Sequence, residues 1–277
     1  MKLAVSNIAW TEADDAAALP RLRDAGVEAL EVAPGRVFAD ALNATIADAE
    51  KIGGQYANAG LPIGSMQSLL FGRPELTLFG SGQDQQELLA HLTQIISLAG
   101  ALGCGPLVFG SPKNRLRGDR SFLEAADEAT PILKLIGDDI AVQHGCTFCL
   151  EANASGYGCD FMTVLGEASA VAAKSEHPGV AQVVDTGNMM MEGETPAAVE
   201  PVIAGVRHLH ISAPNLGPVA EHKTFIEDVI ARAISAGYDA TITVEMRPID
   251  VGSGEDRLSG VLAGAEMVRA IIDRYQG

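Results

Sequence analysis

The sequence predicts an α/β protein, a single (β/α)8 TIM barrel with a parallel eight-stranded core, and three observations predict it. Short apolar runs alternate with longer amphipathic runs along the chain. Strands that alternate with helices form parallel sheets, and eight such units in 277 residues match the length of a barrel. Residues 7–12, at the end of the first strand and directly after it, contain no glycine-rich phosphate loop. This absence argues against the main rival, a doubly wound open sheet.

The expected elements follow this alternation in order. The strands are expected at residues 2–8, 29–32, 63–68, 106–109, 147–151, 181–185, 207–211 and 241–245. The helices are expected at about 12–24, 43–59, 83–102, 120–143, 161–175, 196–204, 221–236 and 256–275. No linker rich in Ser, Pro or Gly and no charge block divides the chain. We therefore expect residues 1–277 to form one TIM-barrel domain.

Composition excludes several classes of partner. Apolar residues make up 47% of the chain and charged residues 20%, as in soluble globular proteins. There are 36 Asp and Glu against 19 Lys and Arg, so the formal net charge is −17. A nucleic-acid surface needs clustered cations, and so does docking on anionic lipid. The sequence thus predicts neither a nucleic-acid nor a membrane partner, and it leaves a homo-oligomer open.

Cysteine usage and the N-terminal segment indicate a cytoplasmic protein. The chain has four cysteines, and Cys146 and Cys149 lie three apart on an expected strand. Side chains at that spacing face opposite sides of a sheet, so neither a shared metal nor a disulfide is expected. The first residues lack the apolar run and cleavage site of a signal peptide. The uncharged stretch 88–112 is interrupted by polar residues and Gly-Pro, and we interpret it as a buried helix, a turn and a strand.

Four candidate metal ligands stand where consecutive strands end. They are Glu151, Asp185, His210 and Glu245, on expected strands five to eight. Catalytic residues of barrels lie at this end, and neighbouring strands are about 4.8 Å apart, so the four side chains can meet at one ion. Each could instead be a helix cap or a rim ion-pair residue, and Asp185 or Glu245 taken alone is more typical of that structural role. Together, three carboxylates would repel one another without a cation, and they suit Mn²⁺ or Mg²⁺, with Co²⁺ or Zn²⁺ as alternatives.

Further rim residues are candidates for substrate binding. The loop after strand four is rich in basic residues, which indicates either a phosphate or carboxylate site or pairing with surface acids. Aromatic and amide side chains at the rim can stack on a sugar or bind its hydroxyls, or simply fill the rim. The candidates are Trp10, Gln67, Lys113, Arg115, Asn188 and Arg247.

The same residues resemble the xylose-isomerase-like barrel superfamily, often labelled sugar phosphate isomerases/epimerases, over nearly the whole chain. The resemblance rests on Leu-Glu151-Ala-Asn153, Val-Asp185-Thr-Gly-Asn188, His208-Leu-His210-Ile-Ser and the run from Gly237 to Glu245. It implies that Glu151, Asp185, His210 and Glu245 bind one divalent ion, and that the two glutamates act as acid and base. The ketose 3-epimerase branch usually has histidine at the position of Asn188. Asparagine forms hydrogen bonds but carries no proton, so the substrate or the activity differs here.

The expected chemistry is a proton transfer next to a carbonyl. A divalent ion that binds a ketone and the adjacent hydroxyl acidifies the neighbouring C–H bond. One of the two glutamates removes the proton to give an enediolate, and the other returns a proton, which yields an epimer or an isomer. We therefore predict a metal-dependent isomerase or epimerase of a sugar or sugar-like hydroxyketone in carbohydrate metabolism. Two alternatives remain: a dehydrating lyase of a cyclic polyol or keto acid, and a non-catalytic ligand-binding barrel whose metal is a structural clip.

Overall fold

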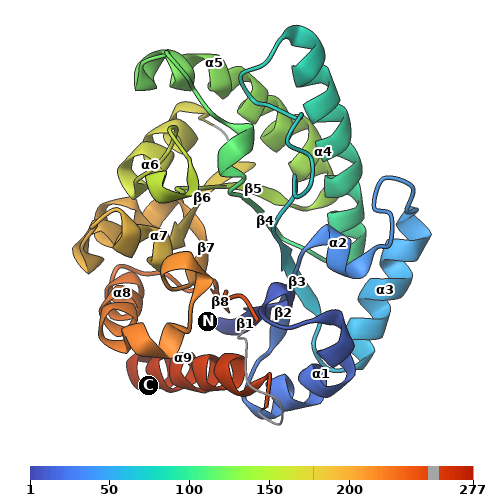
Figure 1. Cartoon of the computed structure of the whole chain (residues 1–277), viewed down its shortest axis with the longest axis vertical. Helices are drawn as coiled ribbons and strands as arrows, with labels where there is room; N and C mark the ends of the chain where they lie inside the picture. Colours follow the sequence, from blue (N-terminus) through green and yellow to red (C-terminus); the bar gives the residue numbers. More distant parts are fainter. Residues whose placement is uncertain (177, 249–255, 277) are drawn as a thin grey trace.

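The computed structural model describes residues 1–176, 178–248 and 256–276, and within these residues eight parallel strands close into a barrel (Figure 1). Each strand pairs with the next in the chain, and β8 pairs with β1 to close the ring. The strands are β1 Lys2–Ser6, β2 Ala29–Val32, β3 Ile63–Met66, β4 Pro106–Phe109, β5 Thr147–Glu151, β6 Val180–Asp185, β7 Val206–Ile211 and β8 Thr241–Val244. The predicted TIM barrel is confirmed.

The longer helices form a ring outside the strands (Figure 1). They are α1 Asp15–Asp24, α3 Ile46–Asn58, α4 Gly82–Leu102, α5 Phe122–Leu135, α6 Leu165–Lys174, α8 Lys223–Ser235 and α9 Ser259–Gln276. Two short helices that the sequence did not predict follow β2 and β6: α2 Pro34–Val37 and α7 Thr186–Met191.

Sequence-encoded caps set where three of the long helices begin. Thr45, Ser81 and Ser121 precede α3, α4 and α5, and each side chain accepts a hydrogen bond from the backbone N–H three residues later. The acidic residue at that third position bonds back to the backbone N–H of the cap residue. This capping box satisfies N–H groups that the first turn of a helix leaves free.

Two expected helices differ in form from the prediction. The helix expected at 120–143 is α-helical only to Leu135, and it continues as a π-helical segment, Ile136–Ala141, and a 3₁₀ turn, Val142–His144. The helix expected at 196–204 is the 3₁₀ segment Pro196–Gly205. Pro201 lies inside that segment and has no N–H, so it removes a donor that an α-helix would need.

The core has an outer and an inner part. The main apolar cluster lies between the strands and the surrounding helices, and Phe148 of β5 and Phe109 of β4 belong to it with ring centroids 5.0 Å apart. A small separate cluster comprises Val108, Cys149, Ala181 and Val183, from β4, β5 and β6. All four cysteines are buried and free, as expected for structural thiols.

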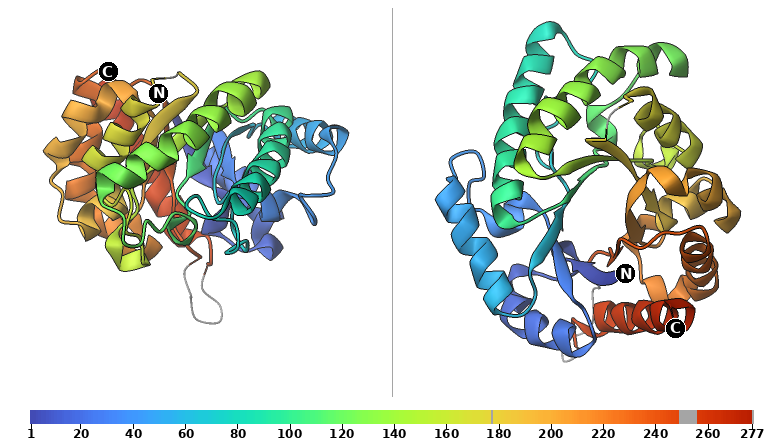
Figure 2. Two further views of the ribbon diagram at one scale, coloured as in Figure 1. Left: turned by 90° about the horizontal axis from the view of Figure 1, so that it is seen from above. Right: turned by 180° about the vertical axis from the view of Figure 1, so that it is seen from behind.

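The two termini lie at the same end of the barrel (Figure 2). Because β1 begins close to the N-terminus and the strands are parallel, the carboxyl ends of all strands lie at the opposite end. The expected site residues therefore gather there. Among the described helices, none combines the length and apolar character that a membrane span requires.

Replacement of Phe148 by Ala should strongly destabilise the barrel. Its side chain is fully buried, and removing it leaves a cavity between β5 and the helices. We expect the free energy of unfolding, measured by denaturant titration, to fall by about 3–5 kcal/mol. As a control, Leu123→Ala removes an apolar side chain that is 72% exposed, and its effect should stay within about 0.5 kcal/mol. Equal effects of the two substitutions would contradict this assignment of the core.

Candidate metal centre

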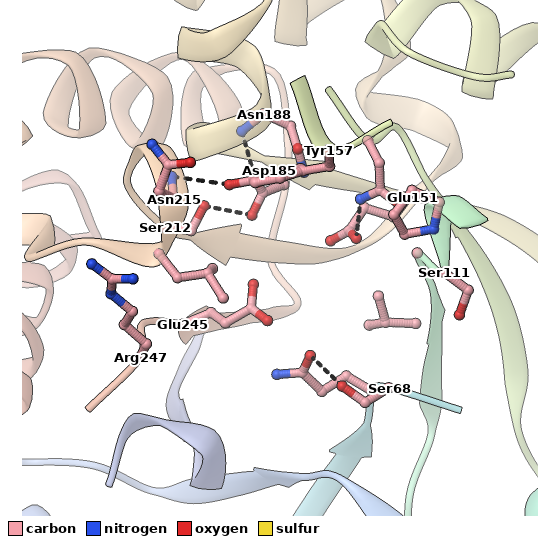
Figure 3. A pocket seen from close by; sticks show the side chains of 16 residues that line it. Ser68, Ser111, Glu151, Tyr157, Asp185, Asn188, Ser212, Asn215, Glu245 and Arg247 are labelled. Atoms are coloured by element: carbon pink, nitrogen blue, oxygen red, sulfur yellow. Dashed lines mark hydrogen bonds between the residues drawn. The ribbon is translucent and has the colours of Figure 1, made fainter. Parts of the chain in front are cut away.

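Four side chains predicted as metal ligands meet at the carboxyl end of the barrel. Nδ1 of His210 lies 3.0 Å from a carboxylate oxygen of Glu151, 3.2 Å from Glu245 and 3.9 Å from Asp185. One donor atom from each of the four residues lies within 4.8 Å of every other. All four side chains are buried, and Figure 3 shows the three carboxylates facing one space from different strands.

Strand register produces this convergence. Asp185 and His210 are direct partners in the pairing of β6 with β7. Glu151 pairs with Val183, two residues before Asp185 and hence on the same side of β6. Glu245 follows β8 directly, and its backbone N–H donates to the carbonyl of Ile211 at the end of β7. The barrel thus brings together four residues that are up to 94 positions apart in the chain, from 151 to 245.

Two hydrogen bonds and one glycine fix the carboxylate of Asp185. It accepts a hydrogen bond from the backbone N–H of Asn188 at 2.6 Å and one from the Ser212 hydroxyl at 2.7 Å (Figure 3). A Cβ at Gly187 would lie 2.3 Å from that hydroxyl oxygen. Only glycine therefore lets the start of α7 approach the end of β7 closely enough to complete the arrangement.

A buried chain of polar groups holds Glu151. The amide of Asn153 donates to one carboxylate oxygen at 2.8 Å, and its own oxygen accepts from the Arg115 guanidinium at 2.9 Å. A Cβ at Gly110 would lie 2.6 Å from the same oxygen of Glu151, so a larger residue there would displace this carboxylate. Asn153 belongs to the motif Leu-Glu151-Ala-Asn153, in which the sequence predicted no role for it.

Glu31 of β2 is a further carboxylate at this centre that sequence analysis missed. It is fully buried, with carboxylate oxygens 3.0 Å from Nε2 of His210 and 2.8 Å from Nε2 of His208. Ser65 donates a hydrogen bond to it at 2.9 Å. A carboxylate that accepts the second ring N–H of a histidine leaves the other nitrogen free to bind a metal. The one signal in the sequence was an acidic residue inside the apolar strand Ala-Leu-Glu-Val.

His210 therefore belongs to two groups of potential ligands within the described residues. One group contains Glu151, Asp185 and Glu245, and the other contains Glu31 and His208. The first group uses Nδ1 of His210 and borders an open cavity, whereas the residues of the second are fully enclosed. A catalytic ion needs open positions for substrate, which favours the first group.

Burial and crowding perturb the titration of this cluster. Burial, with the charges of Glu151 and Glu245, raises the pKa of Asp185 to about 7. Burial alone would lower the pKa of His210, but Glu31 and Glu245 hold it well above its usual value. Burial alone would raise the pKa of Glu31, yet the two imidazoles hold it well below its usual range. Without a cation the cluster thus retains protons, as expected for excess negative charge in a confined space.

A cavity of about 440 Å³ opens in front of the carboxylates. Its volume lies in the range of small-molecule sites. Three of the predicted substrate-binding residues line it: Gln67, Asn188 and Arg247. The lining also includes Tyr157, Ser212 and Asn215, which sequence analysis did not single out; Tyr157 accepts a hydrogen bond from the Asn215 N–H at 2.9 Å.

Three other residues that were predicted to bind substrate do not line this cavity. Arg115 is fully buried and bonds to Asn153, so it offers no surface to a substrate. Trp10 is also buried and donates to Asp15 at 2.6 Å, which corresponds to the alternative that it fills the rim. Lys113 is exposed and lines a neighbouring cavity rather than the one at the carboxylates.

The family pattern described as xylose isomerase-like TIM barrel matches residues 19–271, so the chain belongs to that family. No protein with a curated description matches it in sequence.

Solved structures of the same fold include several sugar epimerases. A D-psicose 3-epimerase from Clostridium cellulolyticum H10 with D-tagatose has a TM-score of 0.73 at 14% identity, over 100% of this chain and 98% of the other. An L-ribulose 3-epimerase has a TM-score of 0.80 at 14% identity, over 100% and 96%. A 3-keto-D-glucoside 4-epimerase from E. coli has a TM-score of 0.70 at 14% identity, over 99% of each chain. At these identities the similarity establishes the shared fold.

Replacement of Glu31 by Gln should weaken metal binding although Glu31 is not in the proposed ligand set. The amide can donate to Nε2 of His210 and so favour the ring form that carries its proton on Nδ1. We expect the affinity for Mn²⁺, measured by calorimetry, to fall by about 10–100-fold. Glu28→Gln, at a half-exposed carboxylate three residues earlier, is the control. Unchanged affinity in Glu31→Gln would show that this contact does not orient His210.

Proton release on metal binding should depend on pH through Asp185. Because its pKa in the folded, metal-free protein is raised to about 7, the carboxyl is protonated below that pH, and an incoming cation must displace the proton. Calorimetry in buffers of different ionisation enthalpy should count about one more proton released near pH 6 than near pH 8. Asp185→Asn should abolish this difference. If the wild-type protein releases the same number of protons at both pH values, Asp185 is not the group that loses a proton when the metal binds.

Proposed function

We propose that this chain is a divalent-metal-dependent isomerase or epimerase of a sugar or sugar-like hydroxyketone. The observation that carries the proposal is the meeting of Glu151, Asp185, His210 and Glu245 beside an open cavity that the three carboxylates line. Membership of the xylose isomerase-like family supports it, as do structural neighbours named as epimerases of psicose, ribulose and a keto-glucoside.

The donor set fits a single hard divalent cation. Three carboxylates and one imidazole supply oxygen and nitrogen ligands, which suit Mn²⁺ or Mg²⁺ and also accommodate Co²⁺ or Zn²⁺. Burial and the neighbouring carboxylates of Glu151 and Glu245 raise the pKa of Asp185, and a bound cation would favour its ionised form. Glu151, Asp185, His210 and Glu245 would hold the ion. When bound, it supplies Lewis-acid polarisation of a substrate carbonyl.

Glu151 and Glu245 are the proposed acid and base. Both carboxylates lie on the wall of the cavity, and they reach it from β5 and from the end of β8 (Figure 3). A substrate carbon between them can lose a proton to one glutamate and regain a proton from the other. Return to the opposite face of the same carbon gives the epimer, and return to the adjacent carbon gives the aldose–ketose isomer.

The remaining proposed contacts favour a polyhydroxylated substrate. Gln67, Asn188 and Arg247 border the cavity with amide and guanidinium groups that bind hydroxyl oxygens. Asn188 holds its place because its side-chain oxygen accepts the N–H of Ala154 at 2.9 Å. We propose that it binds a hydroxyl and takes no part in proton transfer. We further propose that residues 1–277 act as one domain, in the cytoplasm, on a small-molecule sugar or polyol.

The proposal is tested by hydrogen exchange between substrate and solvent. The metal-loaded enzyme, incubated with a panel of ketoses in deuterated water, should incorporate one deuterium per turnover, measured by mass spectrometry. Glu151→Gln and Glu245→Gln should each lower the rate by at least roughly 10²–10⁴-fold, since an amide cannot accept the proton.

The controls distinguish a variant that cannot transfer the proton from a variant that has lost its metal ion. Metal content is measured in each variant, and Glu266→Gln, at an exposed carboxylate on α9, should retain the full rate. Near-normal exchange in a metal-replete Glu151→Gln or Glu245→Gln enzyme would rule out that glutamate. Formation of a conjugated product, detected by ultraviolet absorbance, would instead indicate the dehydrating lyase.

A further inference from the structure

A second cavity adjoins the one at the carboxylates. It also measures about 440 Å³, and the two cavities share the wall residues Ser68, Ser111 and Pro112. Its other walls come from the loop after β3 and the loop after β4, so it lies at the same end of the barrel as the metal centre. Because the first cavity alone has the volume of a small-molecule site, the adjoining second cavity provides room for a further part of a larger ligand.

An exposed aromatic ring forms part of the second cavity. Phe71 is 88% exposed, the largest exposed fraction among the large apolar side chains of the described residues. It lies in the loop after β3 and lines the cavity. A ligand in this cavity that covered the ring would gain the stabilisation that comes from removing its apolar surface from water.

The walls of this cavity are preorganised. The side chain of Asn114 is buried and donates to the carbonyls of Arg73 at 2.7 Å and Leu76 at 2.6 Å, which ties the two loops together. Ser68 and Ser111, which separate the cavities, both adopt left-handed backbone conformations, with φ of 57° and 45°. Non-glycine residues in this region carry strain, and such strain gathers at ligand sites.

The polar groups of the cavity suit hydroxyls better than a strong anion. Arg73 is paired with Glu75, and its guanidinium also contacts His91. Lys113 is exposed and has no ion pair among the described residues. It is thus a single ammonium donor in the cavity that Phe71 also lines, whereas a dedicated phosphate site usually gathers several donors.

We infer that the second cavity binds a second sugar ring, glycosidically linked to the sugar that reacts at the metal centre. A sugar ring presents an apolar C–H face that can stack on Phe71 and hydroxyls at its edge that can accept from Lys113. The two cavities adjoin at Ser68, Ser111 and Pro112, so a ligand that extends across these residues can reach both. The inference rests on the proposed function, because it assigns the first cavity to the reacting sugar. It makes the substrate a glycoside rather than a free monosaccharide.

The test compares binding and exchange for matched sugars. The Mn²⁺-loaded enzyme is titrated with D-fructose, with fructose 6-phosphate and with glucosyl-fructoses linked through O4, O5 or O6. Affinity is measured by calorimetry, and deuterium uptake is measured in parallel. At least one disaccharide should bind more tightly than fructose. Phe71→Ala should weaken that binding about threefold to tenfold, as expected for loss of one stacking contact, and leave fructose unchanged.

Two variants complete the test. Phe71→Tyr should restore disaccharide binding, and Leu123→Ala, at another exposed apolar side chain, should have no effect. The inference is overturned if no disaccharide binds better than fructose, if Phe71→Ala weakens both sugars equally, or if fructose 6-phosphate is preferred through Lys113. Disaccharide binding that depends on Phe71 without deuterium uptake would leave the second-ring site standing and refute the proposed proton transfer.

Discussion

Repulsion among buried carboxylates is the constraint on which this end of the barrel depends. Glu151, Asp185 and Glu245 approach one imidazole nitrogen, and Glu31 approaches the other nitrogen of the same ring. Such an arrangement is unfavourable unless protons or a cation balance the charge. The raised pKa values of Asp185 and His210 show the balance by protons. A divalent cation would balance the same charge. Unlike the protons that it replaces, it would also act as a Lewis acid toward a bound substrate.

The barrel makes this costly arrangement possible because the rest of the fold is ordinary. Its core is apolar, three helices start at capping boxes, and the strands close without an exposed edge. Some departures from these rules lie at the site. Gly187 allows a close approach to the backbone of Ala213, Gly110 leaves room for the carboxylate of Glu151, and Ser111 adopts a left-handed conformation on the cavity wall. The unfavourable free energy of the buried carboxylates is thus offset by the stability of the apolar core, the capped helices and the closed sheet.

Sequence alone predicted the barrel and the four converging residues, because both follow from periodicity and from parallel strands ending on one rim. It missed Glu31, since a contact between β2 and β7 crosses the barrel and leaves no spacing signal. It placed Arg115 on the substrate because a basic loop suggests an exposed surface, whereas the folded loop buries this guanidinium against Asn153. Trp10 is also buried, because its ring packs into the core and its N–H donates a hydrogen bond to Asp15. Side-chain direction in loops is a tertiary property that composition does not encode.

Anomalous diffraction from a crystal of the protein soaked with Mn²⁺ would locate the metal ion. We expect one anomalous peak per chain, bounded by Glu151, Asp185, Nδ1 of His210 and Glu245, on the cavity side of the imidazole. Glu31 should stay on Nε2 of the ring, outside the coordination sphere. A peak between Glu31, His208 and Nε2 of His210, or no peak near His210, would contradict the assignment of this cluster as the metal centre.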